Sequence, residues 1–381
     1  MRSTSEPILT GTRVVELAAR GPAPYGVMLL ADLGAEVIRI DRPTADGIER
    51  LGETVTGRGR RSIAIDLKQA DGLALLLGLV DHADVLVEGY RPGVAERLGF
   101  GPEVCHARNA RLVYARMTGW GQVGPLAARA GHDINYLAVA GGLHPIGDAD
   151  RPPPPPLNLV ADYGGGGTFL VIGILAALLE RERSGIGQVL DVAMVDGVSS
   201  LLTAFHALHG MGLWRDERGA NLLDGGAPWY RTYRTADDRF VAVGCLEPGF
   251  YRILLDRLGL DPEAWPQYDE DVWPALHEEL ARIFGAEPRS HWEAVFEGID
   301  ACVTPVLTLD EAARSAQLVA RETLVSTADG LVPGPAPRFS RTPSRVAERS
   351  RPPAEDSDWV LDVLGVPPDA RRELRRRGVV S

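Results

Sequence analysis

Residues 13–41 read RVVELAARGPAPYGVMLLADLGAEVIRID. Two runs rich in Val and Ile, at 13–17 and 36–41, are typical of buried strands, and residues 25–34 between them have the apolar spacing of a helix. A strand, a helix and a strand joined by short turns are typical of a parallel β-α-β unit with a right-handed crossover. This stretch therefore predicts an α/β fold.

The same alternation continues along the chain. Strands are predicted at 62–66, 84–88 and 111–117, and a helix at about 72–82. Because helices cover both faces of a parallel sheet, its strands are apolar almost throughout, as these are. We therefore expect a doubly wound, Rossmann-like parallel sheet.

A second apolar region follows the proline run at 152–156. It predicts a helix at about 168–181, then a strand at 188–192 and a helix at 194–209. The longest apolar run of the first helix, 169–179, is too short to span a bilayer, so we expect a buried helix.

A smaller α+β domain is predicted at 225–315. Residues 229–235 and 239–245 have the pattern of a β-hairpin, and two or three amphipathic helices follow. Residues 332–356 are rich in proline and poor in apolar side chains, which is typical of an extended connection. A helical pattern returns at 359–380.

Composition excludes several classes of protein. The net charge of −12 argues against general binding to nucleic acid or to an anionic membrane. The N-terminal residues contain no apolar segment of the kind a signal peptide needs. Cys105, Cys245 and Cys302 are far apart and lack the spacing of a zinc site, as expected in a reducing compartment. We therefore expect a cytoplasmic protein that binds no metal, nucleic acid or membrane.

Two glycine-rich segments suggest binding sites. Residues 119–124 (GWGQVG) match the spacing of a dinucleotide-binding fingerprint, but Pro125 follows and no helix begins there, so NAD binding is not expected. Residues 164–167 (GGGG) lie at the predicted start of a helix, just after Asp162. Asp162 is either a helix cap or a carboxylate beside a turn whose free N–H groups stabilise an oxyanion.

Several polar residues lie just beyond the predicted strands. His132 and Asp133 follow the strand at 111–117, at the edge where parallel sheets place their sites, although a single histidine is more often structural. The cations at these strand ends are Arg42, Lys68, Arg91 and Arg97. They either converge on a phosphorylated ligand or are scattered, solvated charges.

Taken together, these segments resemble the class III CoA-transferase superfamily and, within it, the α-methylacyl-CoA racemase branch. The resemblance covers about residues 9–345. The segments that carry it, in chain order, are RVVEL (13–17), LADLGAEVIRIDRP (30–43), IDLK (65–68), VEGYRPGVAERLG (87–99), ARMTGWGQVGP (115–125), AGHDINY (130–136), PPLNLVADYGGG (155–166), RGANLLDGGAP (218–228) and ACVTPV (301–306).

The resemblance implies a two-base 1,1-proton transfer at the carbon beside a CoA thioester. His132 and Asp162 match the residues that act on opposite faces of that carbon, and Glu247 matches a glutamate that holds the histidine, from the same chain or a partner chain. Asp133 would belong to the same polar network. To act as a neutral acid, Asp162 needs a raised pKa, and we expect its burial to outweigh the opposing effect of a helix N-terminus.

The resemblance also implies how CoA is bound. The residues at the family's CoA-binding positions are Arg42, Ile65, Asp66, Leu67, Lys68, Gly89, Tyr90, Arg91 and Arg97. The histidine loop adds Gly131, Ile134, Asn135 and Tyr136. Coenzyme A is part of the substrate, so no separate cofactor is expected.

The resemblance further implies an interlocked homodimer with a large, discontinuous domain. We expect its first part at 1–215, the small domain at 225–315, and a return segment with a C-terminal helix at 325–381. Met117 and Met194, with Met211, could line an acyl site or pack in the core.

Two other functions stay open. The transferases of the superfamily use the same aspartate as a nucleophile but lack the histidine of the Gly131–His132–Asp133 loop. A CoA-transferase that forms an aspartyl–CoA thioester at Asp162 is therefore the alternative to the racemase. A CoA-binding protein without catalytic activity is the third hypothesis.

Overall fold

The structure is a computed structural model that describes residues 6–43, 56–327, 330–347 and 351–381. The chain divides into two compact units. The larger one comprises the chain up to Ala140, Pro156–Leu201 and Ala320–Ser381, and the smaller one comprises Gly141–Pro155 and Leu202–Val319. The smaller unit thus includes 141–155 and 202–215, two stretches inside the first predicted domain.

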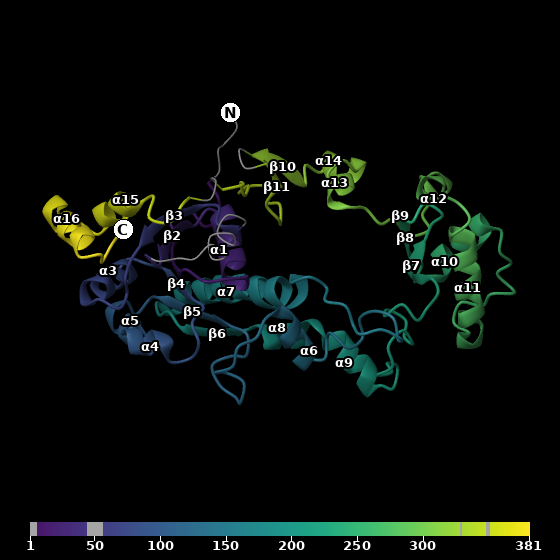
Figure 1. Ribbon diagram of the computed structural model, residues 1–381, viewed down its shortest axis with the longest axis horizontal. Coiled ribbons are helices and arrows are strands. Elements are labelled where there is room, and N and C mark those ends of the chain that lie inside the picture. The colour runs from purple at the N-terminus through teal and green to yellow at the C-terminus, as the bar shows by residue number, and fades with distance from the viewer. Residues whose placement is uncertain (1–5, 44–55, 328–329, 348–350) are drawn as a thin grey trace. The chain divides into compact units, whose positions relative to one another are not determined.

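A six-stranded parallel sheet forms the centre of the larger unit (Figure 1). Its strands are β1 (Arg13–Leu17), β2 (Glu36–Asp41), β3 (Arg60–Ala64), β4 (Val85–Glu88), β5 (Val113–Thr118) and β6 (Val189–Ala193). They lie in the order β3-β2-β1-β4-β5-β6, which is the doubly wound order, with its reversal between β1 and β4. The predicted parallel α/β sheet is confirmed.

Helices cover both faces of this sheet. The helices of the larger unit are α1 (Pro22–Asp32), α3 (Ala70–Val80), α4 (Val94–Leu98), α5 (Pro102–Arg108), α6 (Asp133–Val139), α7 (Thr168–Ser184), α8 (Met194–Leu201), α15 (Ser357–Val363) and α16 (Pro368–Arg376). Side chains of α3, α5 and α15 pack on one face, against a core that includes Ile38, Leu86 and Tyr114. On the other face, α1 contacts β2, and α7 contacts β5 and β6. Burial on both faces explains why these strands are apolar throughout.

The apolar helix is longer than predicted. A π-helix, Leu159–Gly167, precedes α7 and continues into it, and the two form one helix of 26 residues. By length and composition this helix could cross a membrane, so the prediction of a helix too short to do so is wrong. It packs on α1, β5 and β6, and its buried Arg181 pairs with Asp84. Only 33% of its most apolar 18-residue stretch is buried, so the prediction of a buried helix is confirmed only in part.

The four glycines lie inside the π-helix rather than at its start. A Cβ on Gly165 would lie 2.9 Å from the backbone N of Val198, and one on Gly167 would lie 2.9 Å from the carbonyl O of Pro22. These residues therefore allow the π-helix to approach α8 and α1 closely. The predicted role of 164–167 as a turn with free N–H groups is wrong, because the helix begins five residues earlier, at Leu159.

Two further predictions differ in detail. The strand predicted at 62–66 lies at Arg60–Ala64, whose residues pair with Val37–Asp41 of β2. Just beyond it, Ile65 donates its N–H to the carbonyl of Asp41 and forms a β-bridge with Val380. The helix predicted at 194–209 consists of α8 and α9 (Thr203–Gly210), and the break between them falls where the chain passes from one unit to the other.

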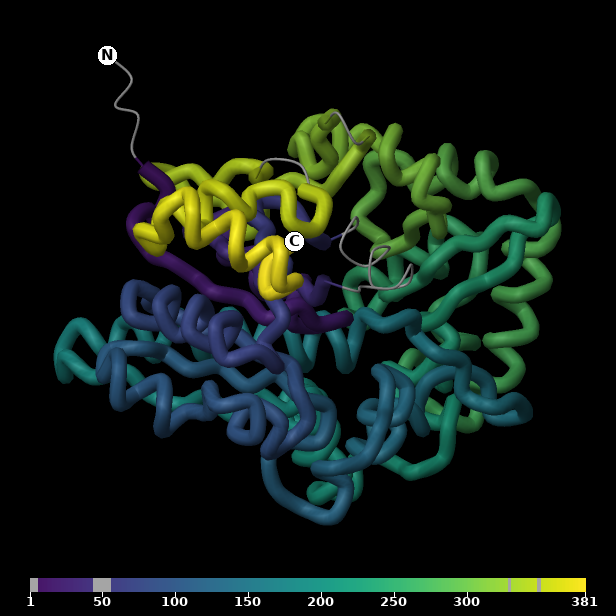
Figure 2. The backbone as a smooth tube through the Cα atoms, turned by 60° about the vertical axis from the view of Figure 1, so that its left-hand side comes forward, coloured from purple at the N-terminus to yellow at the C-terminus, as the bar shows by residue number. Residues whose placement is uncertain are grey.

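The C-terminal segment docks on the third strand of the sheet. Figure 2 shows this segment, in yellow, beside the first strands in purple and blue. Asp356 and Ser62 exchange hydrogen bonds, since each accepts a backbone N–H from the other. The N–H of Asp66 donates to the carbonyl of Val379, and Ile65 forms a β-bridge with Val380.

The smaller unit has an antiparallel sheet in the order β7-β8-β9. Its strands are β7 (Tyr230–Arg234), β8 (Phe240–Gly244) and β9 (Val303–Pro305). Its helices are α9, α10 (Pro248–Leu258), the 3-10 turn Glu270–Val272, α11 (Trp273–Phe284), α12 (Arg289–Phe296) and α13 (Leu309–Ala312). The predicted hairpin is confirmed, and its buried face packs around Trp229. A short helix and a hairpin follow in the chain, α14 (Ala316–Ala320), β10 (Leu324–Thr327) and β11 (Gly330–Pro333).

Candidate active site

A cavity of about 780 Å³ lies at the carboxyl ends of the parallel strands. Its lining comes from the residues after β1, β2, β4, β5 and β6, and from the loop that leads into α6. These are Ala18, Ala19, Arg20, Gly21, Pro22, Ala23, Arg42, Gly89, Tyr90, Arg91, Pro92, Met117, Thr118, Gly119, Trp120, Ala127, Arg129, Ala130, Gly131, His132, Tyr136, Asp162 and Met194. The reversal of strand order between β1 and β4 lies at this edge, where ligands bind in doubly wound sheets.

His132 is the residue that immediately precedes α6. Its backbone N–H donates a hydrogen bond to Oδ1 of Asn135, at 3.0 Å. The hydroxyl of Tyr136 donates to the carbonyl of Gly131, and the Tyr136 ring packs edge-on against Trp120. Burial raises the pKa of Tyr136 to about 12, so this hydroxyl stays neutral and can donate. The backbone of His132 is thus held on both sides while its side chain lines the cavity.

Asp133 faces the backbone of the π-helix. Its Oδ2 accepts hydrogen bonds from the N–H groups of Ala161 and Asp162, both at 2.8 Å. The first turn of a helix leaves such N–H groups without intrahelical partners, so the Asp133 carboxylate caps this helix from outside. Asp133 is 5% exposed and is absent from the cavity lining. It connects the His132 loop to the helix that carries Asp162.

Asp162 lies in the first turn of the π-helix, half-buried in the cavity wall. The side-chain amide of Asn158 donates to its Oδ2 at 3.3 Å. Gly21, with a φ of +70°, precedes α1, and a Cβ there would lie 3.0 Å from the same oxygen. Only glycine fits there, because of both its backbone conformation and the close approach.

The pKa of Asp162 is raised above the ordinary aspartate value, which is the predicted direction. Desolvation by burial is the largest cause, and the neighbouring Asp133 adds to it. The Asn158 hydrogen bond and the nearby His132 act in the opposite direction. This environment favours the neutral carboxylic acid more than water does.

Six of the predicted CoA-binding residues line the same cavity: Arg42, Gly89, Tyr90, Arg91, Gly131 and Tyr136. The guanidinium of Arg42 lies over the Tyr90 ring, 6.0 Å from its centroid. Met117 and Met194 also line the cavity, and Met211 belongs to the smaller unit.

The other predicted CoA-binding residues lie outside the cavity lining. Ile65 is buried in the core, and Asp66 accepts hydrogen bonds from the N–H of Lys68 and the side chain of Gln69, which lower its pKa. Leu67 packs against the same core. The remaining side chains, which are exposed, are Lys68, Arg97, Ile134 and Asn135.

Two arginines of the cavity, Arg20 and Arg129, were not predicted from the sequence. Arg20 follows β1, so the rule that selected Arg42 and Arg91 could have found it. Arg129 lies in the loop before α6 and has no such signal. With these two, four arginines line one cavity in a protein of net charge −12.

Glu247 belongs to the smaller unit, where it directly precedes α10. Its carbonyl accepts the N–H of Tyr251. Its predicted role toward the histidine stays a prediction.

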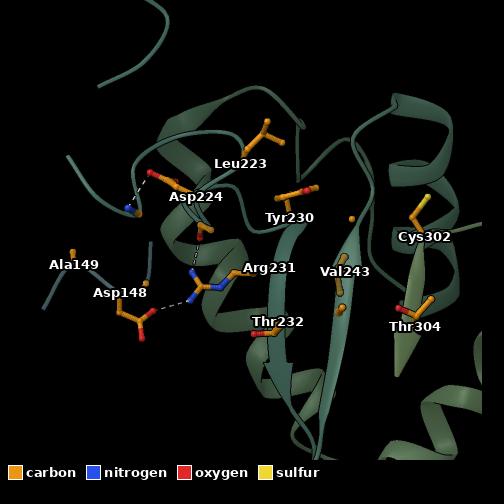
Figure 3. A pocket seen from close by; sticks show the side chains of 15 residues that line it. Asp148, Ala149, Leu223, Asp224, Tyr230, Arg231, Thr232, Val243, Cys302 and Thr304 are labelled. Atoms are coloured by element: carbon orange, nitrogen blue, oxygen red, sulfur yellow. Dashed lines mark hydrogen bonds and ion pairs between the residues drawn. The ribbon is translucent and has the colours of Figure 1, made fainter. Parts of the chain in front are cut away.

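A second cavity, of about 710 Å³, lies within the smaller unit (Figure 3). Arg231 donates to the carbonyl of Gly225 at 2.9 Å and pairs with Asp148 at 3.8 Å. Asp224, from the RGANLLDGGAP segment, accepts backbone N–H groups of its own loop and so shapes one wall. The predicted catalytic residues do not line this cavity.

Comparison with known proteins identifies the family. Residues 9–358 match the family model described as CoA-transferase family III. The chain belongs to CoA-transferase family III. This family III protein is 47% identical to α-methylacyl-CoA racemase of Mus musculus, over 88% of each chain. It is 43% identical to α-methylacyl-CoA racemase of Homo sapiens, over 94% of this chain and 93% of that one.

The chain is also similar to a transferase and to a protein of known structure. An acetyl-CoA:oxalate CoA-transferase of Acetobacter aceti is 32% identical over 85% of this chain and 87% of its own. The crystal structure of a CAIB/BAIF family protein from Brucella suis matches with a TM-score of 0.81 and 27% identity, covering 94% of this chain and 100% of that chain.

Proposed function

We propose that this protein interconverts the (R) and (S) forms of 2-methylacyl-CoA thioesters by moving one proton. The observation that carries the proposal is that His132 and Asp162 line the same cavity. The proposal is also supported by 43–47% identity, over most of the chain, to two proteins named α-methylacyl-CoA racemase. Such an enzyme takes part in lipid and fatty-acid metabolism, and we propose that it acts in the cytoplasm.

In the proposed reaction, one of the two side chains removes the α-proton and the other returns a proton to the opposite face. The raised pKa of Asp162 suits a group that must be neutral in one direction and ionised in the other. Loss of the α-proton leaves an enolate with negative charge on the thioester oxygen. The first turn of α1 lines the cavity, and the positive end of its dipole favours that charge.

CoA would bind along the carboxyl ends of the strands. Arg20, Arg42, Arg91 and Arg129 suit its phosphates, because a guanidinium pairs with phosphate oxygens in two parallel hydrogen bonds. Lys68, after β3, and Arg97, on α4, would extend this site along the same edge of the sheet.

We also propose a homodimer in which Glu247, from the same chain or its partner, orients His132. Exposed apolar side chains on the larger unit support a contact surface, since Ile172 and Leu179 of α7 are 55% and 67% exposed. Light scattering coupled to size-exclusion chromatography would give twice the chain mass, and a single chain mass would contradict this part of the proposal.

The reaction itself is tested by α-hydrogen exchange. The protein is incubated with one enantiomer of a 2-methylacyl-CoA in deuterated water, without an acceptor acid. We expect loss of the α-proton signal together with approach to a 1:1 mixture of enantiomers. Asp162→Ala should slow both by at least about 100-fold, the usual contribution of a positioned acid or base. Asp81→Ala, at an exposed aspartate after α3, is the matched control and should react as the wild type.

The same experiment separates the alternatives. If the α-proton is retained but labelled CoA moves to an added carboxylic acid, the protein is a CoA-transferase and Asp162 is its nucleophile. If neither occurs while CoA binds, the protein is a CoA-binding protein without this activity.

A further inference from the structure

A buried charge cluster lies behind the loop that carries the proposed CoA ligands. Glu88, the last residue of β4, is fully buried, and its Oε1 accepts a hydrogen bond from Nε of Arg116 at 3.1 Å. Arg116 lies opposite it on β5 and is 8% exposed. The same guanidinium pairs through Nη2 with Glu96 of α4, at 2.9 Å. One arginine thus connects the end of a strand to the helix that follows it.

This cluster fixes both ends of the segment between β4 and α4. Oε2 of Glu88 accepts the backbone N–H of Tyr90 at 2.6 Å, so the carboxylate bonds to the loop as well as to Arg116. At the far end, Glu96 belongs to α4 and is next to Arg97. A Cβ on Gly93 would lie 3.4 Å from Nη1 of Arg97, so this guanidinium lies beside the loop.

The cluster does not contact the cavity. The cavity is lined by the loop at 89–92. It is not lined by Glu88, Glu96 or Arg116. Replacement of a buried ion pair by apolar residues is often neutral or stabilising, so the cluster is weak evidence for added stability. Its geometry is specific, however, because a planar guanidinium bridges two carboxylates and one of these also bonds the loop backbone.

We propose that Arg116 is a positioning residue for CoA, which holds Tyr90, Arg91 and Arg97 in their binding arrangement through Glu88 and Glu96. This inference rests on the proposed function, since it assumes that these three residues contact CoA. Arg116 itself touches neither substrate nor reacting atoms. Its loss should therefore weaken CoA binding and leave proton transfer at the thioester largely unchanged.

The test compares two buried arginines attached to opposite ends of the same strand. Arg116→Met removes the bridge at the carboxyl end of β4. Arg181→Met is the matched control. Arg181 is 7% exposed, and its Nη2 pairs at 2.9 Å with Asp84. Asp84 directly precedes the amino end of β4. Each variant loses a buried arginine with a carboxylate partner, but only Arg116 is connected to the loop.

Binding of CoA to the full-length protein is measured by isothermal titration calorimetry, at a temperature where thermal unfolding shows all variants folded. We expect Arg116→Met to raise the CoA dissociation constant about tenfold or more, as for loss of one charge-assisted hydrogen bond. Arg181→Met should stay within about twofold of the wild type. If Arg116→Met does not fold, Glu96→Gln replaces it, because Glu96 is half-exposed and its replacement should leave the protein folded. Glu96→Gln should raise the CoA dissociation constant severalfold.

A second readout distinguishes positioning from general damage. In the exchange assay, Arg116→Met should raise KM for the CoA thioester and leave kcat within about twofold. With the N-acetylcysteamine thioester, which lacks the nucleotide, kcat/KM should equal that of the wild type. Equal CoA binding by Arg116→Met and the wild type would overturn the inference. If the wild type does not bind CoA, the proposed CoA site is wrong and the inference fails with it.

Discussion

At the scale of the residue, the surroundings of the Asp162 carboxyl group determine its pKa and so its availability as an acid or a base. Burial and the neighbouring Asp133 raise the pKa of Asp162, while the amide of Asn158 lowers it by donating to Oδ2. A donor favours the ionised carboxylate, so it opposes the effect of burial. Asn158 therefore reduces the fraction of Asp162 that is in the acid form at a given pH.

Replacement of Asn158 by leucine should raise the pKa of Asp162 further, because the donor is lost and the group becomes less solvated. When Asp162 acts as the base, activity disappears as the pH falls through its pKa. The acidic limb of kcat/KM for exchange should therefore move to higher pH. Asn109→Ala, at an amide that donates to the carbonyls of Val80 and Ala83, should leave the limb in place. An acidic limb that stays in place in Asn158→Leu would show that Asn158 does not act on this carboxyl.

Several residues of the site could be predicted because their signal is local. Arg42 and Arg91 follow apolar strands, and this spacing alone places them at one edge of a parallel sheet. Arg129 has no comparable signal, since it lies in a loop without periodicity. The orientation of Asp133 toward the N–H groups of Ala161 and Asp162 depends on two segments that are distant in sequence. No pattern within either segment indicates it.

At the scale of the element, the π-helix depends on close contact with α8. A Cβ on Gly197 would lie only 1.8 Å from the carbonyl O of Gly165, so any side chain at this position separates the two helices. We expect Gly197→Ala to lower the free energy of unfolding by about 3 kcal/mol or more, as overpacking of a tight contact does. It should also displace Asp162 and reduce exchange activity.

Chemical denaturation measures this change, and Gly173→Ala is its control. Gly173 lies within α7, and a Cβ there would meet only Cδ1 of Leu190, at 3.4 Å. Since alanine is the better helix former, this variant should be as stable as the wild type or slightly more stable. Equal stabilities of the two variants would contradict the packing argument.

The elements differ in how clearly the sequence predicts them. Runs of Val and Ile predicted β1 and β2 with their observed bounds, because buried strands are short and apolar. The π-helix was missed, since a run of glycines carries no side-chain periodicity and resembles a turn. Its glycines serve packing against partners that the sequence does not reveal.

At the scale of the whole molecule, the larger unit is assembled from three separate sections of the chain. Val379 and Val380 are buried, although they lie far in sequence from the strand they cover. Val380→Asp places a charge in this contact and should destabilise the unit by about 3 kcal/mol or more. Because the carbonyl of Val379 accepts the N–H of Asp66, the variant should also raise KM for the CoA thioester.

Thermal unfolding and the exchange assay measure these two effects. Val319→Asp is the control, since Val319 is 59% exposed and its replacement should change neither quantity. An unchanged melting temperature in Val380→Asp would show that the C-terminal contact is dispensable. The sequence predicted an extended segment and one final helix, which in the structure is two helices, α15 and α16. It did not predict where they dock, because contacts between distant segments leave no periodic signal.

The docking of the C-terminal segment has a consequence for synthesis on the ribosome. The strands up to β6 emerge first, yet the surface around Ile65 stays uncovered until residues 356–380 have also left the exit tunnel. Most of the smaller unit, Leu202–Val319, is translated in between, so it can fold while the larger unit is still incomplete. During this interval the nascent protein exposes apolar surface that the finished one buries, and a prematurely terminated chain would present that surface to chaperones and proteases.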